Sequence, residues 1–128
     1  MIGPPYLDLV ASPSMEARVA GLLQGDLGFK GKATNYATHA VHAFAAKFPP
    51  QLPRTFIEGL TSPGDIVLDP MAGSGTALVE AAILGRSAVG ADIDPLALKI
   101  CRAKTTPIDP EDALLYAERI ADWALTSP

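Results

Sequence analysis

Residues 66–76 read IVLDPMAGSGT, and this stretch decides how the rest of the chain is interpreted. Its first three residues are β-branched or apolar and predict a short strand. Asp69-Pro70 ends that strand, and residues 73–76 open a helical pattern that continues to Gly85, a residue suited to a left-handed helix cap. The sequence therefore predicts a strand, a glycine loop and a helix, in that order.

A second strand and another helix follow. Residues 88–91 (AVGA) form the next short strand-like run, which ends in Asp92. Asp94 with Pro95 predicts the start of a helix that extends to about Lys104. Two parallel strands joined by a crossover helix result, which is the unit of an α/β, Rossmann-like fold.

Further helices are expected on both sides of this unit. A helix start at residues 12–16 with an end near Gly25, an amphipathic pattern over residues 50–60, and the helix start Asp109-Pro110 indicate three of them. We therefore divide the chain into an N-terminal helix and loop (residues 1–33), a βαβ region with the segment before it (residues 34–108) and a C-terminal helix (residues 109–128).

Composition excludes several classes of protein. The 128 residues, with 48% hydrophobic content and a net charge of −4, suit one compact domain or a piece of a larger one. No run approaches 18 uninterrupted apolar residues, so a membrane span is not expected. The single Cys101 rules out an internal disulfide and a cysteine-only metal site, and the N-terminus lacks a signal-peptide pattern. A reducing, cytoplasmic setting is expected.

The charge is unevenly distributed along the chain. No acidic residue lies between Asp26 and Glu58, whereas four basic residues do: Lys30, Lys32, Lys47 and Arg54. Such a stretch is either a solvated loop or a surface that faces phosphate, carboxylate or nucleic acid. Both interpretations stay open at this point.

The glycine loop predicts a nucleotide site. Gly73 and Gly75 let ligand atoms approach the backbone at a helix N-terminus, and Asp92, some 23 positions after Asp69, is placed to accept hydrogen bonds from a ribose diol. The alternative is that the glycines only make a tight turn and that Asp92 caps the next helix. No Lys follows Gly75, as a phosphate loop requires, and the GxGxxG pattern is absent. Asp69 would repel a pyrophosphate but suits an ammonium group, which favours S-adenosylmethionine.

Three ordered motifs resemble the amino-group DNA methyltransferases, the N6-adenine and N4-cytosine class. Residues 69–76 (DPMAGSGT) are similar to the family's DPFxGSGT, and residues 90–97 (GADIDPLA) to its GxDxxPxA. Residues 38–50 (THAVHAFAAKFPP), which we call the strap, resemble THxxHPYPAKFPP, a segment that closes over the methionine part of the cofactor. The resemblance covers about residues 34–108. The departures are mostly apolar: Ala43, Phe44, Ala45, Met71 and Ala77.

The resemblance implies a partial class I methyltransferase fold that binds S-adenosylmethionine. It assigns Asp69 and Thr76 to the methionine end, Asp92 to the ribose and Ile93 to one face of the adenine. The full set of expected cofactor-binding residues is Lys47, Phe48, Asp69, Met71, Gly73, Ser74, Gly75, Thr76, Asp92 and Ile93. For Phe48 a core aromatic is the alternative. For His39 and His42 we expect a hydrogen-bonded loop role, and neither is expected to act as a base.

The motif that would hold the target amine, (D/N/S)PP(Y/F/W), has no match. Only Gly3-Pro4-Pro5-Tyr6 comes near it, and that segment lacks the polar first residue. We therefore expect no catalytic residue and no metal ligand in this chain, which would be inactive alone and truncated before the catalytic motif, with DNA bound through the complete protein. The unpartnered edge of a two-stranded sheet predicts self-association. The alternatives are a fragment of an RNA guanine-N2 methyltransferase and a stand-alone S-adenosylmethionine-binding or assembly module.

Overall fold

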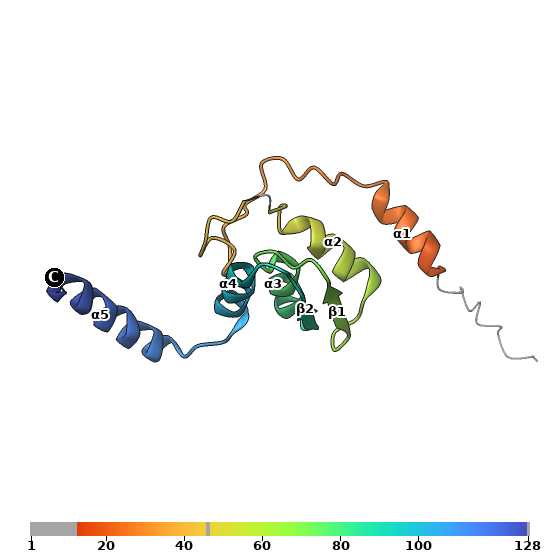
Figure 1. Ribbon diagram of the computed structural model, residues 1–128. Helices are drawn as coiled ribbons and strands as arrows, with labels where there is room; N and C mark the ends of the chain where they lie inside the picture. The colour runs from red at the N-terminus through yellow and green to blue at the C-terminus, as the bar shows by residue number, and fades with distance from the viewer. Residues whose placement is uncertain (1–12, 46, 128) are drawn as a thin grey trace, which may run out of the picture.

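A computed structural model describes residues 13–45 and 47–127 (Figure 1). The described residues form five helices and two strands, in the order α1 (Met15–Leu23), α2 (Gln51–Leu60), β1 (Ile66–Asp69), α3 (Thr76–Ile83), β2 (Ser87–Gly90), α4 (Pro95–Thr105) and α5 (Pro110–Thr126). Every element predicted from the sequence within this range is present, with bounds that differ by at most three residues. The segment Gly3-Pro4-Pro5-Tyr6 lies outside the described residues.

The two strands form a parallel pair. Ile66 pairs with Ser87 and Asp69 with Gly90, so both strands end at the same edge of the sheet. Helix α3 connects them and ends at Ile83. Gly85, two positions later, has a φ of +74° and is the predicted left-handed cap. The arrangement is a partial Rossmann-like fold, and it brings the glycine loop after β1 next to the chain segment after β2.

Helix α3 covers one face of this sheet. Val79 and Ala81 are buried on it and form the core together with Ala97 and Ile100 of α4. A Cβ atom at Gly90 would lie 2.7 Å from Leu78 Cδ2 and 3.1 Å from the Ala72 Cβ, so a glycine at the end of β2 leaves room for these two side chains. Ile57 of α2 is buried as well, so the core of the described region lies around α3, between α2, α4 and one side of the β1–β2 pair.

The opposite face of the sheet is uncovered. Ile66, Leu68 and Val89 point to it, and Leu68 is 67% exposed. Helix α5 buries none of its residues, and Figure 1 shows it extending away from the βαβ unit. Its start is nevertheless the predicted one, because Asp109 Oδ1 accepts a hydrogen bond from the Glu111 N–H at 2.8 Å.

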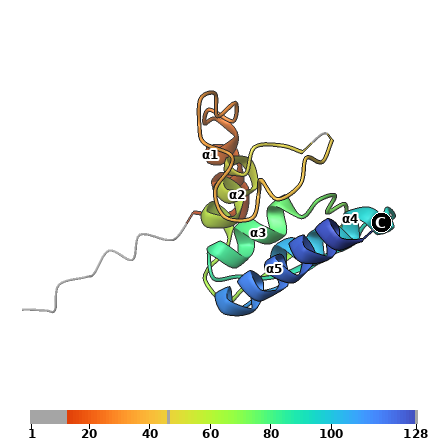
Figure 2. The same ribbon diagram turned by 90° about the vertical axis from the view of Figure 1, so that its left-hand side faces the viewer.

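The N-terminal helix packs against α2. Arg18 Nε donates to the Gly59 carbonyl at 3.1 Å, and a Cβ atom at Gly59 would lie 2.7 Å from Leu22. Figure 2 shows α1 and α2 together at one end of the unit. The helix begins later than predicted, since Ser14 is its N-cap and its Oγ accepts from the Ala17 N–H. No helix in the described part of the chain is long and apolar enough to cross a membrane.

Candidate functional site

The loop between β1 and α3 has the geometry that its glycines predict. Gly73 has a φ of +50° and Gly75, the N-cap of α3, has a φ of +78°, a region that side chains disfavour. The Gly75 N–H donates to the Ala72 carbonyl at 2.7 Å, which closes the turn. A Cβ atom at Gly75 would lie 2.9 Å from Cys101 Sγ. The loop therefore requires glycine at position 75 for both its conformation and its close packing.

Helix α4 supports the loop from behind. Cys101 Sγ donates to the Gly73 carbonyl at 3.1 Å, and buried Lys104 donates through Nζ to the Ser74 carbonyl at 2.8 Å. Burial raises the pKa of the Cys101 thiol, which keeps its proton available as a donor. Burial also lowers the pKa of Lys104, and Lys47 acts in the same direction. Neither residue was predicted from the sequence to have this role.

The carboxylate of Asp92 joins the two strand ends. Its Oδ2 accepts from the Gly73 N–H at 2.7 Å and its Oδ1 from the Asp94 N–H at 2.9 Å. The N–H groups of Asp94 and then Gly73 lower the pKa of Asp92. The cap of α4 is Asp94, whose Oδ1 accepts from the Leu96 N–H at 2.8 Å, so the alternative in which Asp92 caps that helix is wrong. A carboxylate oxygen can accept a second hydrogen bond, which leaves Asp92 acceptor capacity for a ligand.

The strap is tied to the rest of the unit by polar contacts. Thr38 Oγ1 donates to the Lys104 carbonyl at 3.0 Å. Lys47 Nζ donates to the His39 carbonyl at 2.8 Å and to the His42 carbonyl at 3.2 Å, which closes the strap on itself. Phe48 is 43% exposed, so the alternative of a core aromatic is wrong.

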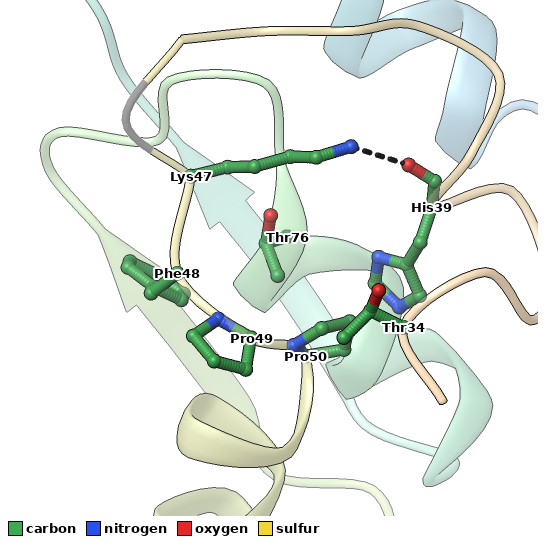
Figure 3. Close-up of a pocket in the computed structure, with 7 residues that line it drawn as sticks. All are labelled: Thr34, His39, Lys47, Phe48, Pro49, Pro50 and Thr76. Atoms are coloured by element: carbon green, nitrogen blue, oxygen red, sulfur yellow. Dashed lines mark hydrogen bonds between the residues drawn. The ribbon is translucent and has the colours of Figure 1, made fainter. Parts of the chain in front are cut away.

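Two small pockets lie where the strap meets the loop. The larger, of about 180 Å³, is drawn in Figure 3 and is lined by Thr34, His39, Lys47, Phe48, Pro49, Pro50 and Thr76. The smaller, of about 80 Å³, is lined by strap residues and by Met71, Ala72, Gly73, Ser74 and Thr76 of the loop. Thr76, Lys47 and Phe48 belong to both pockets. Among the described residues, the buried Ser74 Oγ has no hydrogen-bond partner.

The predicted cofactor residues fall into two groups. The structure brings six of them together around the smaller pocket: Lys47, Phe48, Met71, Gly73, Ser74 and Thr76. The other four line neither pocket. Among these, Asp69 Oδ1 accepts from the Met71 N–H at 3.1 Å, and Ile93 is 99% exposed beside Asp92. The strap and the loop thus line one pocket, and Asp92 is bonded to the loop through Gly73.

A buried polar cluster that was not predicted from the sequence lies beneath the strap. Glu80 Oε1 accepts from Tyr36 Oη at 2.6 Å and pairs with His39 Nε2 at 2.7 Å, while Arg54 lies 3.4 Å from Oε2. Burial and then Glu80 raise the pKa of Tyr36 to about 12. The bond to Glu80 confirms a hydrogen-bonded loop role for His39. Burial lowers the pKa of this histidine. The available signal was that Glu80 is the one charged residue within residues 76–83 (TALVEAAI).

Comparison with known proteins agrees with this geometry. The family model described as DNA methylase matches residues 26–103, more than half of the chain. The chain belongs to the DNA methylase family. Type II methyltransferase M.MvaI of Kocuria varians is 43% identical over 88 residues, which are 66% of this chain and 19% of that protein. Type II methyltransferase M.MjaII of Methanocaldococcus jannaschii is 34% identical over 97 residues, 73% of this chain and 18% of that protein.

This DNA methylase chain thus spans about a fifth of the length of these two relatives. Among solved structures, the complex of M1.HpyAVI with SAM is 26% identical with a TM-score of 0.49, over 53% of this chain and 34% of that one. The cytosine-N4-specific PvuII DNA methyltransferase is 23% identical with a TM-score of 0.48, over 88% of this chain and 35% of that one.

Proposed function

We propose that this chain binds S-adenosylmethionine and is the cofactor-binding part of a DNA methyltransferase that acts on the exocyclic amine of adenine (N6) or cytosine (N4). The observation that carries the proposal is the closure of the strap over the glycine loop, with pockets at the N-terminus of α3 and Asp92 bonded to the same loop. The identity of the cofactor is inferred from the resemblance of three ordered motifs and from the family match.

The amino-acid end of the cofactor fits the strap side of this site. The first N–H groups of a helix lack intrahelical partners and favour an anion, here the cofactor carboxylate at the start of α3. Ser74 Oγ adds an unpaired hydroxyl to the smaller pocket, and Lys47 adds a cation to its wall. Asp69 and Thr76 also bind the amino-acid end of the cofactor, and Asp69 does so by pairing with the ammonium group of the cofactor.

The nucleoside end fits the region after β2. Asp92 retains lone pairs for two ribose hydroxyls while it keeps its bonds to Gly73 and Asp94. Ile93 is almost fully exposed next to it and offers an apolar surface for one face of the adenine. Gly73 and Gly75 allow the ligand to approach the loop backbone between the two ends.

Methyl transfer requires a group that holds the target amine in line with the methyl carbon. The chain contains no (D/N/S)PP(Y/F/W) segment, so we propose that it binds the cofactor without transferring its methyl group. The complete protein would supply that segment and the DNA contacts. The match to the DNA methylase family favours DNA over the alternative of an RNA guanine-N2 substrate.

Self-association of this chain is also part of the proposal. The face formed by Ile66, Leu68 and Val89 is exposed and apolar, and among the described residues each strand of the pair has one unpaired edge. A specific interface on this face would bury more than about 1,000 Å². We further propose a reducing cytoplasmic setting, which suits the buried free thiol of Cys101.

Calorimetric titration with S-adenosylhomocysteine, compared with ATP and NAD, tests the binding proposal. We expect weak one-to-one binding of S-adenosylhomocysteine alone, because a partly open pocket buries only part of the ligand. Folded protein that binds none of the three would refute a preformed site. Tritium transfer from labelled S-adenosylmethionine into DNA would refute the claim that this chain lacks the transfer step.

A further inference from the structure

We propose that Glu80 is a positioning residue that holds the strap on α3 and thereby sets the shape of the cofactor pocket. This inference rests on the proposed function, because it gives that site a buried support. Glu80 lies four positions after the end of the DPMAGSGT segment, on the part of α3 that faces the core.

The carboxylate of Glu80 receives contacts from three directions. It is 0% exposed, and its Oε1 accepts from Tyr36 Oη, just before the strap, and from His39 Nε2 within the strap. Arg54 of α2 approaches Oε2 at 3.4 Å. A buried carboxylate is costly unless it is paired and hydrogen-bonded, so the fold keeps Glu80 only together with these partners. The strap is consequently held where Tyr36 and His39 reach Glu80.

The contact continues from Glu80 to the pocket wall. His39 is itself buried, and its carbonyl accepts from Lys47 Nζ at 2.8 Å. His39 and Lys47 both line the 180 Å³ pocket (Figure 3). Removal of the Glu80 carboxylate would free His39 and, through it, the part of the strap that carries Lys47.

Helix α3 also provides the pocket wall that lies opposite the strap. Thr76 and Glu80 are four positions apart on α3 and therefore lie on one face of it. Thr76 lines both pockets, whereas Glu80 holds the strap that closes them. One helical turn thus sets the distance between the loop and the strap.

Glu80→Met tests this role, because methionine keeps the volume and the helix propensity but accepts no strong hydrogen bond. We expect affinity for S-adenosylhomocysteine to fall about tenfold, because the ligand would then have to order the released strap as it binds. 5′-Methylthioadenosine lacks the amino-acid end that the strap covers. Its affinity for Glu80→Met should therefore stay within about twofold of its affinity for the wild type, a much smaller change than the loss expected for S-adenosylhomocysteine. The affinity of Glu80→Gln for S-adenosylhomocysteine should lie between those of the wild type and Glu80→Met, since its amide oxygen still accepts from Tyr36 and His39.

Glu58→Met is the matched control. Glu58 accepts from the same arginine, with Arg54 Nη2 at 3.0 Å from Oε1, but it is exposed, and no hydrogen bond joins it to the strap in the described part of the chain. We expect Glu58→Met to bind both ligands as the wild type does. Hydrogen exchange should rise at the strap amides of His39 and Val41 in Glu80→Met and stay unchanged in β1 and β2.

The outcomes separate this inference from the proposed function. A folded wild type that fails to bind S-adenosylhomocysteine would overturn both. Wild-type binding together with unchanged affinity in Glu80→Met, or equal losses for the two ligands, would overturn the positioning role alone. If Glu80→Met does not fold, Tyr36→Phe carries the test, because it removes one donor to Glu80 and leaves the carboxylate in place. Its affinity for S-adenosylhomocysteine should fall, and an unchanged value would overturn the inference.

Discussion

The backbone N–H of Gly73 donates to Oδ2 of Asp92 at 2.7 Å, so the loop after β1 is bonded directly to the chain segment after β2. The parallel pairing makes this possible, because Asp69 and Gly90 are partners at the end of the two strands. The carboxylate that we assign to the ribose therefore also orders the loop that approaches the rest of the cofactor.

Asp92→Ala should weaken S-adenosylhomocysteine binding roughly ten- to a hundredfold, because it removes a charged acceptor from the ribose hydroxyls. It also removes the two bonds to Gly73 and Asp94, so some loss of thermal stability should accompany the loss of binding. Titration calorimetry and a thermal melt measure the two effects, with Asp122→Ala on exposed α5 as the control. Unchanged binding with lowered stability would mean that Asp92 only orders the loop.

Gly75→Ala should destabilise the fold by about 2–4 kcal/mol, from a left-handed alanine and the contact with Cys101 Sγ. Gly64→Ala is the matched control: Gly64 has a φ of +91°, but nothing lies within 4 Å of its Cβ position. In Gly64→Ala the free energy of unfolding should fall only by the cost of a left-handed alanine, about 1–2 kcal/mol. Urea unfolding of both gives the difference, and equal losses would contradict the close packing of the loop on α4.

Acid should destabilise the fold through His39. Burial lowers the pKa of His39 from 6.5, and the positive charges of Lys104 and Lys47 act in the same direction. Glu80 raises the pKa, but the lowering effects are larger. Tyr36 is the remaining titratable neighbour, packed edge-on against the ring. Because the unfolded chain binds the proton more readily, this contribution is complete above pH 6.5 and is lost as the pH falls toward the lower pKa of the folded state.

Unfolding by urea from about pH 5 to about pH 8 measures this dependence. His39→Gln should flatten the curve relative to the wild type, while His42→Gln, at an exposed position, should leave it unchanged. An identical pH dependence in all three proteins would show that His39 does not titrate with folding.

Leu68→Lys should reduce self-association, because it places a charge in the centre of the uncovered sheet face beside its partner Val89. Leu125→Lys is the control on α5, where the side chain is also exposed. Light scattering over a range of concentrations distinguishes the two surfaces. A wild type that stays monomeric at every concentration would contradict the proposed association, and an effect of Leu125→Lys alone would place it on α5.

The βαβ unit could be predicted from sequence because its signals are local. The strands at residues 66–69 and 87–90, the glycine loop and the caps Asp94 and Asp109 each depend on a few neighbouring residues. The candidate residues of the glycine loop could be predicted for the same reason, because they belong to one continuous motif.

The supports of the site were not predictable in this way. Glu80 meets His39 across 41 positions, and Lys104 meets the Ser74 carbonyl across 30. Single charged residues in helices are usually solvent-exposed, so their burial becomes evident only once the strap and α4 are in place. The capping role considered for Asp92 was wrong because Asp94, two positions later, supplies the acceptor that the first turn of α4 needs.

The central claim is that the loop, the strap and Asp92 together form one site for S-adenosylmethionine. Backbone amide NMR during titration with S-adenosylhomocysteine tests it most directly. We predict saturable shifts at Gly73, Gly75 and Asp92 together with the strap amides around His39, and no shifts in α5. A folded chain whose spectrum does not change, or whose shifts fall outside the loop and the strap, would contradict the account.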